Sequence, residues 1–173
     1  MATDTEVLLG RLATLLDKQA VYEALLGIAR GVDRFDPALL AACIHADAVL
    51  DMGGVTPIAG AAFAKAMTPP DEPPIGRMHL VANPVIVVEG DAARVEYYVI
   101  SGQELRQGTG SETRLRAGRY LDRFERRDGA WKLARRTFVD EWARTDPVKA
   151  APAKGRNRGR PAPKDLSCRN DHR

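Results

Sequence analysis

The hydrophobic period of this sequence changes once along the chain, at a proline-rich stretch from Thr68 to Gly76. Proline has no amide hydrogen and a fixed φ, so four prolines in this stretch exclude a helix or an inner strand and predict a loop. Before the stretch, apolar residues recur at helical spacing, as at Val21, Leu25 and Ile28; after it, apolar and polar residues alternate. Helices first and an antiparallel sheet afterwards predict the α+β class rather than a parallel α/β fold.

The helical part divides at residues that are typical of helix ends. Asp17 is the expected N-cap of the first helix, and Pro37 suits the first turn of the second. We therefore expect helices at about 17–33, 37–44 and 60–67, and a short strand at 48–52 before a Gly53-Gly54 turn. The alternating part predicts four strands joined by short turns, some of which contain glycine, at 78–88, 92–105, 112–126 and 131–142.

The charge is distributed unevenly between a body and a tail. The whole chain has 173 residues and a pI near 9.0, which fits one domain with a basic balance. Residues 149–173 hold eight Lys or Arg and two Asp, while residues 1–148 hold 18 Lys or Arg and 21 Asp or Glu. We expect a folded, mildly acidic domain at 1–146 and a flexible basic tail at 147–173, because the tail has no apolar periodicity.

The tail is expected to be a solvated extension or, alternatively, a weak electrostatic contact for nucleic acid or an anionic surface. It has no aromatic residue on which a base could stack, so nucleic acid is not expected as the main partner.

Neither a membrane-spanning run nor a signal peptide is present, which predicts a cytoplasmic protein without a membrane partner. Cys43 and Cys168 stand in unlike surroundings and predict no disulfide.

Several local sequences, in this order and spacing, resemble the SnoaL-like family of the nuclear-transport-factor-two-like superfamily over about residues 7–146. They are Asp33-Arg34-Phe35-Asp36, Met78-His79, Val88-Glu89-Gly90-Asp91-Ala92, and Gly118-Arg119-Tyr120 through Asp128-Gly129-Ala130-Trp131. Polyketide cyclases, scytalone dehydratase, bile-acid dehydratases, a dehydrochlorinase and ketosteroid isomerases are among the relatives. The resemblance implies a cone-shaped, cystatin-like α+β barrel, in which N-terminal helices pack into a strongly curved antiparallel or mixed sheet around an apolar pocket.

The resemblance also implies a catalytic pair. In the dehydratase-like relatives an aspartate at the end of the first helix lies in the pocket and pairs with a strand histidine, and the matching residues here are Asp33 and His79. A histidine can both take and give a proton near neutral pH, and a carboxylate partner would hold it in one tautomer. Two other interpretations stay open: Asp33 begins a solvated turn, or His79 is a core histidine bonded to a backbone carbonyl.

Three residues of the helical part are expected to line the substrate pocket. Tyr22 lies on the same helix face as Asp33. Ile28 and Met52 stand where the relatives often carry a polar residue, a lysine or tyrosine at one position and a tyrosine at the other. This pocket is therefore expected to be more apolar than those of the lyase-like relatives.

Three sheet residues complete the expected substrate-binding set. Tyr98 is chosen over its neighbour Tyr97, because adjacent strand residues point to opposite faces and only one can face inward. Glu104 could place a further ionisable group at the pocket mouth, and Arg119 could bind an oxyanion or carboxylate. The alternative for both Glu104 and Arg119 is an exposed surface charge.

Function follows from the implied pair and pocket. We expect a cofactor-independent lyase or isomerase, of dehydratase, dehydrohalogenase or cyclase type, acting on a hydrophobic, ring-containing or steroid-like molecule. The alternative is a non-catalytic small-molecule-binding or assembly protein of the same fold.

No nucleotide loop and no metal-ligand spacing is present, so neither cofactor nor metal is expected. A dimer or trimer is expected, since such sheets leave one face apolar.

Overall fold

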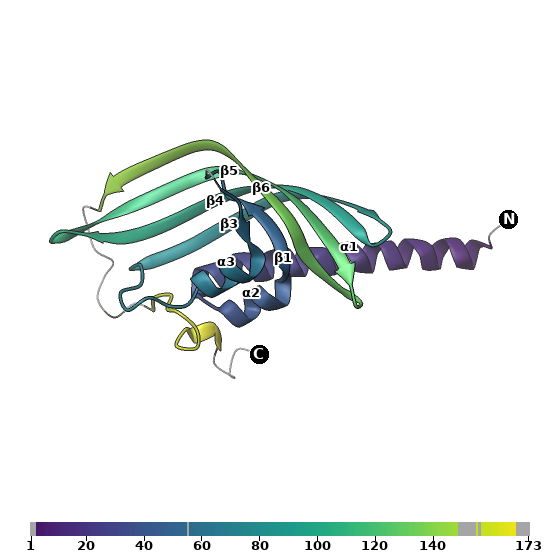
Figure 1. Cartoon of the computed structure of the whole chain (residues 1–173), viewed down its shortest axis with the longest axis horizontal. Coiled ribbons are helices and arrows are strands. Elements are labelled where there is room, and N and C mark those ends of the chain that lie inside the picture. Colours follow the sequence, from purple (N-terminus) through teal and green to yellow (C-terminus); the bar gives the residue numbers. More distant parts are fainter. Residues whose placement is uncertain (1–2, 55, 149–154, 156, 169–173) are drawn as a thin grey trace.

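The computed structural model describes residues 3–54, 56–148, 155 and 157–168 of the chain. Its elements are α1 (Asp4–Arg34), α2 (Pro37–Cys43), β1 (Ile44–Asp51), β2 (Ile58–Ala59), α3 (Gly60–Ala66), β3 (Gly76–Glu89), β4 (Ala92–Gln107), β5 (Gly110–Arg127), β6 (Ala130–Pro147) and the short 3-10 helix η1 (Leu166–Cys168). The six strands form one sheet in the order β2-β1-β6-β5-β4-β3, in which β1 and β6 are parallel and all other pairs antiparallel. Figure 1 shows the sheet arching over the three helices. The predicted α+β barrel with a curved, mixed sheet is confirmed.

The start of α1 differs from the prediction. The helix begins at Asp4, because Thr3 and Glu6 form a capping box: the Thr3 hydroxyl accepts the Glu6 N–H, and the Glu6 carboxylate accepts the Thr3 N–H. Asp17 is therefore not an N-cap. It lies in mid-helix, where its carboxylate accepts hydrogen bonds from Arg126 and from the Trp131 indole. The first turns of α1 project beyond the barrel (Figure 1).

The other elements lie close to their predicted positions. The second helix ends at Cys43, and the predicted strand at 48–52 is longer, since β1 starts at Ile44. Each of the four long strands extends a few residues beyond its prediction, and the proline-rich loop separates α3 from β3 as expected. Gly90 and Gly129 have φ values of +61° and +77°, a region open to glycine, and they close the two predicted hairpins.

The core lies between the concave face of the sheet and one stripe of α1. Val21, Leu25 and Ile28 of α1 are buried against Phe124 of β5 and Leu133 of β6. The stripe continues at helical spacing to the end of α1, so the same packing that buries it carries Asp33 to the edge of the sheet. The helix end is fixed by Phe35, which has a left-handed backbone with φ +50° and lies outside the last helical turn.

The described part of the tail packs against the barrel. Residues 157–168 lie near the C-terminal end of α1 (Figure 1), where the Ala162 N–H donates to the Arg34 carbonyl. Within this segment Asp165 accepts N–H groups from Arg160 and Ser167, and the flexible tail at 147–173 stays a prediction. The remaining tail residues, 149–154, 156 and 169–173, lie outside the described residues.

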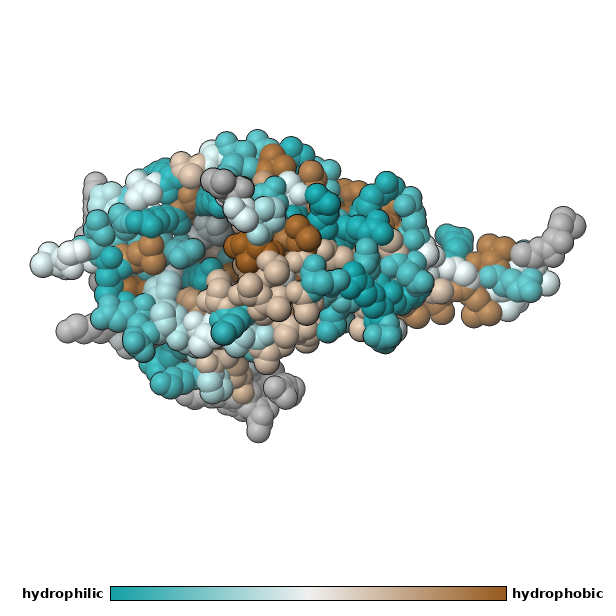
Figure 2. Space-filling model, in the orientation of Figure 1, coloured by the Kyte–Doolittle hydropathy of each residue, from teal (hydrophilic) through white to brown (hydrophobic). Residues whose placement is uncertain are grey.

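Among the described residues, two groups of apolar side chains are exposed. One follows the projecting turns of α1, whose exposed side chains are Val7, Leu8, Leu9, Leu12, Leu15 and Leu16 (Figure 2). The other is on the sheet and includes Leu80, Val85, Val87, Tyr98, Ile100 and Leu121. Surfaces of this kind fit the expected homo-oligomer, which stays a prediction.

In the described ranges, no helix is both long and apolar enough to cross a membrane.

Gly118 is expected to be indispensable for the packing of β5 on β6. A Cβ at this position would lie 2.2 Å from the Val139 carbonyl oxygen and 2.7 Å from the Phe138 ring. We expect Gly118→Ala to lower the free energy of unfolding by about 3 kcal/mol, since overpacking forces a backbone shift. Urea denaturation measures the loss. The matched control is Gly10→Ala, where a Cβ meets nothing within 4 Å and an exposed helix gains propensity. An unchanged urea midpoint for Gly118→Ala would contradict the close approach.

Candidate active site

A cavity of about 290 Å³ lies on the concave face of the sheet, beside the C-terminal half of α1. Apolar side chains from α1, α3 and the sheet make up much of its wall, and charged or hydroxyl-bearing side chains occupy the rest. The lining residues are Ile28, Ala29, Val32, Met52, Phe63, Arg77, His79, Val81, Tyr97, Val99, Ser101, Gln103, Arg114, Arg116, Tyr120, Arg136 and Phe138. This composition is typical of a small-molecule site, which is mostly apolar with a few polar groups.

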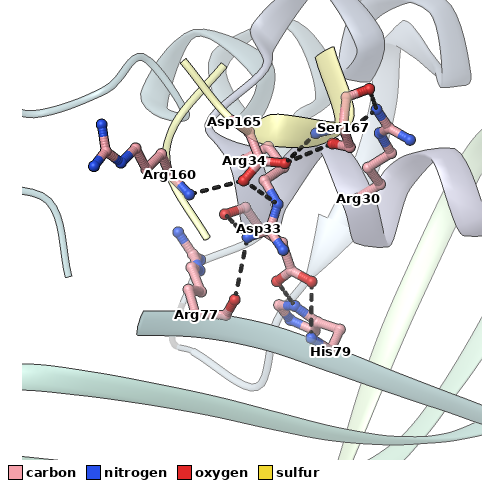
Figure 3. A network of polar contacts seen from close by, with 8 residues as sticks. All are labelled: Arg30, Asp33, Arg34, Arg77, His79, Arg160, Asp165 and Ser167. Carbon is pink, nitrogen blue, oxygen red and sulfur yellow. Dashed lines mark hydrogen bonds and ion pairs between the residues drawn. The ribbon is translucent and has the colours of Figure 1, made fainter. Parts of the chain in front are cut away.

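Asp33 and His79 meet at the wall of this cavity. One Asp33 carboxylate oxygen lies 2.6 Å from His79 Nδ1, and the other accepts the His79 backbone N–H at 2.9 Å (Figure 3). Each side chain is 12% exposed, so the contact is largely shielded from water. The two contacts fix the carboxylate against the start of β3. Asp33 lies in the last turn of α1, and its carboxylate is the partner of the His79 ring in these contacts.

The histidine is held with one ring nitrogen free. An ionised carboxylate can only accept, so Nδ1 donates its hydrogen to Asp33 and a neutral ring carries its lone pair on Nε2. Nε2 has no hydrogen-bond partner among the described residues. Because the ring of His79 lines the cavity, the pair can act as a base toward a molecule bound there.

Arg77 is a cation of the cavity wall that lies two residues before His79, on the same face of β3. Its guanidinium lies over the Phe35 ring, 5.0 Å from the ring centre, and its Nε is buried with no partner among the described residues. Burial lowers the pKa of Arg77 from its ordinary value, and the nearby charge of Asp33 partly offsets this effect. Arg77 is therefore a desolvated cation at the cavity.

A buried ion pair forms part of the sheet side of the cavity. The Arg136 guanidinium donates to both Asp122 oxygens at 2.9 and 2.7 Å, and the Tyr97 hydroxyl donates to Asp122 at 3.1 Å. Arg136 also lies 4.0 Å from the centre of the Tyr120 ring. Burial opposes the charge of Arg136, but Asp122 outweighs it and holds the pKa of Arg136 above its ordinary value. Burial raises the pKa of Tyr97 and of Tyr120, so both hydroxyls stay protonated.

The cavity's other arginines also have carboxylate partners. Arg116 donates from Nε to Asp140 at 2.6 Å and lies 4.3 Å from the centre of the Phe138 ring. Its hydrogen bond with Asp140 raises the pKa of Arg116 and lowers that of Asp140. Arg114 pairs with Glu112. In the described part of the chain, Arg77 is the one cavity arginine without a carboxylate within ion-pair distance.

The structure places two of the six expected substrate-binding residues in the cavity. Ile28 and Met52 both line the cavity, and Arg116 Nη2 donates to the Met52 carbonyl at 3.3 Å. Tyr22, in contrast, is not among the lining residues and is only half-buried on α1. Its helical offset from Asp33 placed it too far along α1 to reach the cavity.

The three sheet residues were assigned to the wrong face. Tyr98 is 51% exposed on the outer face, and its cross-strand partner there is Arg119, which binds Glu96 and Glu141. Glu104 accepts hydrogen bonds from Ser111 and from Arg158 of the tail instead of facing the cavity. The reason is the phase of β4: Ala93, Val95, Tyr97 and Val99 are buried, so the alternate residues point outward.

Sequence reasoning also missed eight polar residues of the cavity. They are Arg77, Tyr97, Ser101, Gln103, Arg114, Arg116, Tyr120 and Arg136. Arg77 could have been identified because it lies two residues from His79 on β3 and therefore on the same face. Tyr97 and Tyr120 are cross-strand partners, so the face that Tyr97 occupies on β4 also determines the face of Tyr120 on β5. Arg136 gives no local signal, because it is one of several arginines in its strand. Within the described ranges, no three His, Cys, Asp or Glu side chains are grouped as a metal site would require.

Asp122 is expected to be needed for the fold as well as for the cavity. Its side chain is fully buried, so Asp122→Ala leaves the Arg136 charge without a partner and should lower the free energy of unfolding by about 3–5 kcal/mol. Urea denaturation measures this. Glu96→Ala, which removes an exposed partner of Arg119, is the control and should change little. Equal effects of the two changes would contradict the importance of the buried pair.

Comparison with known proteins gives the family. A model of the SnoaL-like domain matches residues 13–137. No curated protein sequence matches the chain. Among solved structures, LinA is 25% identical with a TM-score of 0.63, over 84% of this chain and 98% of that one.

Two structures from Novosphingobium are also similar. A candidate scytalone dehydratase from Novosphingobium aromaticivorans DSM 12444 is 22% identical with a TM-score of 0.67, over 83% of this chain and 96% of that one. The hexachlorocyclohexane dehydrochlorinase LinA-type3 from Novosphingobium barchaimii LL02 is 23% identical with a TM-score of 0.63, over 83% and 95% of the two chains. These likenesses show a shared fold. With the family match over most of its length, the chain belongs to the SnoaL-like domain family.

Proposed function

We propose that this protein is a cofactor-independent lyase or isomerase that acts on a hydrophobic, ring-containing small molecule. The observation that supports this most is the contact of Asp33 with His79 at the wall of a mostly apolar cavity. The family to which the chain belongs includes such enzymes, and similar structures carry the names of a scytalone dehydratase and of a dehydrochlorinase.

In the proposed reaction His79 is the base. Its Nε2 takes a proton from a substrate carbon, and the electrons of that C–H bond form a new double bond as hydroxide or halide leaves the neighbouring carbon. Asp33 keeps the hydrogen of Nδ1 and stabilises the imidazolium that forms, the role of the carboxylate in other Asp-His pairs. In an isomerisation the imidazolium would return its proton to a different carbon, so no other reactant is needed.

Arg77 is the proposed partner of the charge that develops on the substrate. It is a partly buried cation at the cavity, with a buried Nε, two residues from the base, and it has no carboxylate within ion-pair distance in the described chain. A fixed cation that is already desolvated stabilises developing negative charge more strongly than one in water. In this proposal Arg77 takes the oxyanion-binding role that was expected of Arg119.

The cavity supports a compact and apolar substrate. A volume of about 290 Å³ is at the small end of ligand pockets. Ile28, Val32, Val81 and Val99 offer apolar contacts in the cavity that His79 lines, while Ser101 and Gln103 are neutral polar partners. A non-catalytic ligand-binding protein is the second candidate, and it is favoured by the apolar Ile28 and Met52 in the wall.

The test is a turnover screen with steroids, polyketide-like phenols and cyclic halides, using the wild type, His79→Ala and Asp33→Asn. We expect elimination or double-bond migration with at least one class, and a loss of kcat of about 100- to 10,000-fold in both variants. His45→Ala is the matched control, because His45 is bonded to the Glu125 carbonyl away from the cavity. Unchanged turnover in both variants would refute the roles of the pair. Ligand binding without turnover in the wild type would favour the second candidate.

A further inference from the structure

The described tail residues form part of the surroundings of the Asp33–His79 pair. A second cavity, of about 380 Å³, has His79 and Asp33 in its wall together with Asp165 and Ser167 of the tail. His79 therefore borders the substrate cavity on one side and a space walled by the tail on another. Figure 3 shows the tail segment next to the end of α1, with Arg34 between Asp165 and Asp33.

From this arrangement we infer that Asp165 is a positioning residue: it binds Arg34 and so leaves the Asp33 carboxylate to His79. The inference rests on the proposed function only for its effect on turnover, since the contact itself can be measured without a substrate.

The tail is attached to the end of α1 by several independent contacts. The Ala162 N–H donates to the Arg34 carbonyl at 2.6 Å, which satisfies one of the carbonyl groups that a helix leaves unpaired at its C-terminal end. Arg30 donates to the Ser167 carbonyl at 3.3 Å and to its hydroxyl at 3.2 Å. The position of Asp165 next to Arg34 is therefore fixed by backbone as well as side-chain contacts.

Asp165 is itself a buried carboxylate with more than one type of partner. The residue is 6% exposed, and its oxygens accept the Arg160 N–H at 2.8 Å, the Ser167 N–H at 3.0 Å and the Ser167 hydroxyl at 2.6 Å. Its Oδ2 lies 3.4 Å from Arg34 Nε. Burial would raise the pKa of Asp165, but the Ser167 and Arg160 hydrogen bonds and the charge of Arg34 outweigh it and lower the pKa to about 2. The carboxylate is thus ionised at neutral pH and can neutralise Arg34.

Arg34 is a competitor for Asp33 because its guanidinium already reaches the Asp33 main chain. The Nη1 of Arg34 already donates to the Asp33 main-chain carbonyl at 3.2 Å and to the Arg77 carbonyl at 3.5 Å. Guanidinium groups bind carboxylates strongly and often with two parallel hydrogen bonds. Both Asp33 oxygens are bonded to His79, so an Arg34 that turned onto this carboxylate would take the acceptor away from Nδ1.

The experiment compares Asp165→Asn with the double variant Asp165→Asn/Arg34→Gln in the full chain. The ring nitrogen chemical shifts of His79, assigned by their loss in His79→Ala, report which nitrogen carries the hydrogen. We expect a single Nδ1–H tautomer in the wild type, a mixture in Asp165→Asn, and the wild-type signal again in the double variant, because the unpaired guanidinium is then absent. With a substrate from the turnover screen, kcat should fall roughly 10- to 100-fold in Asp165→Asn and recover in the double variant.

Asp71→Asn, in the exposed proline-rich loop, is the matched control and should change neither readout. A wild-type tautomer in Asp165→Asn would overturn the inference, and so would an altered tautomer that the second substitution does not restore, since that result indicates a merely structural role. If the tautomer responds as expected but no substrate is turned over by the wild type, the positioning role stands and the proposed function fails. If turnover is lost in His79→Ala but is unaffected by Asp165→Asn, the proposed function stands and the positioning role of Asp165 fails.

Discussion

The contact between the end of α1 and the start of β3 is the constraint on which the site depends. β3 is an edge strand of the sheet, bonded on one side to β4, and the His79 N–H on its free side donates to Asp33. A buried N–H without a partner is costly, so this carboxylate stabilises the strand as well as holding the imidazole. The helix can supply it only because Phe35 ends α1 with a left-handed residue directly after Arg34. One aspartate thereby joins the first helix, the edge of the sheet and the base.

The sequence predicted the order of elements better than it predicted which way their side chains face. A period-two pattern is sufficient to locate a strand, but on β4 both phases carry apolar residues, Tyr97 and Val99 on one face and Tyr98 and Ile100 on the other. Burial in the folded sheet decides between the phases, and local sequence cannot. An error of one residue moves a whole set of side chains, which is why Tyr98 and Arg119 were misassigned together.

Other parts of the site were predictable only in part. Ile28 and Met52 were found because they match positions of a resemblance, and the pairing of Asp33 with His79 came from the same source. The start of α1 was missed although Thr3 and Glu6 have the spacing of a capping box, since apolar residues further along the helix gave the stronger signal. The composition of the tail describes an average over its residues, and it does not reveal that one acid, Asp165, can order the segment around itself.

The distribution of carboxylates around the cavity explains how several arginines can lie near one base. Arg136 is neutralised by Asp122, Arg116 by Asp140, and Arg114 by Glu112. Arg34, outside the cavity, is neutralised by Asp165. Each of these pairs neutralises a cation of the site or its surroundings, while the Asp33 carboxylate is bonded to His79. Since Arg77 has no carboxylate of its own within the described residues, its charge is the one that remains for a bound molecule, and the same pairing that protects the base also selects the cation beside it.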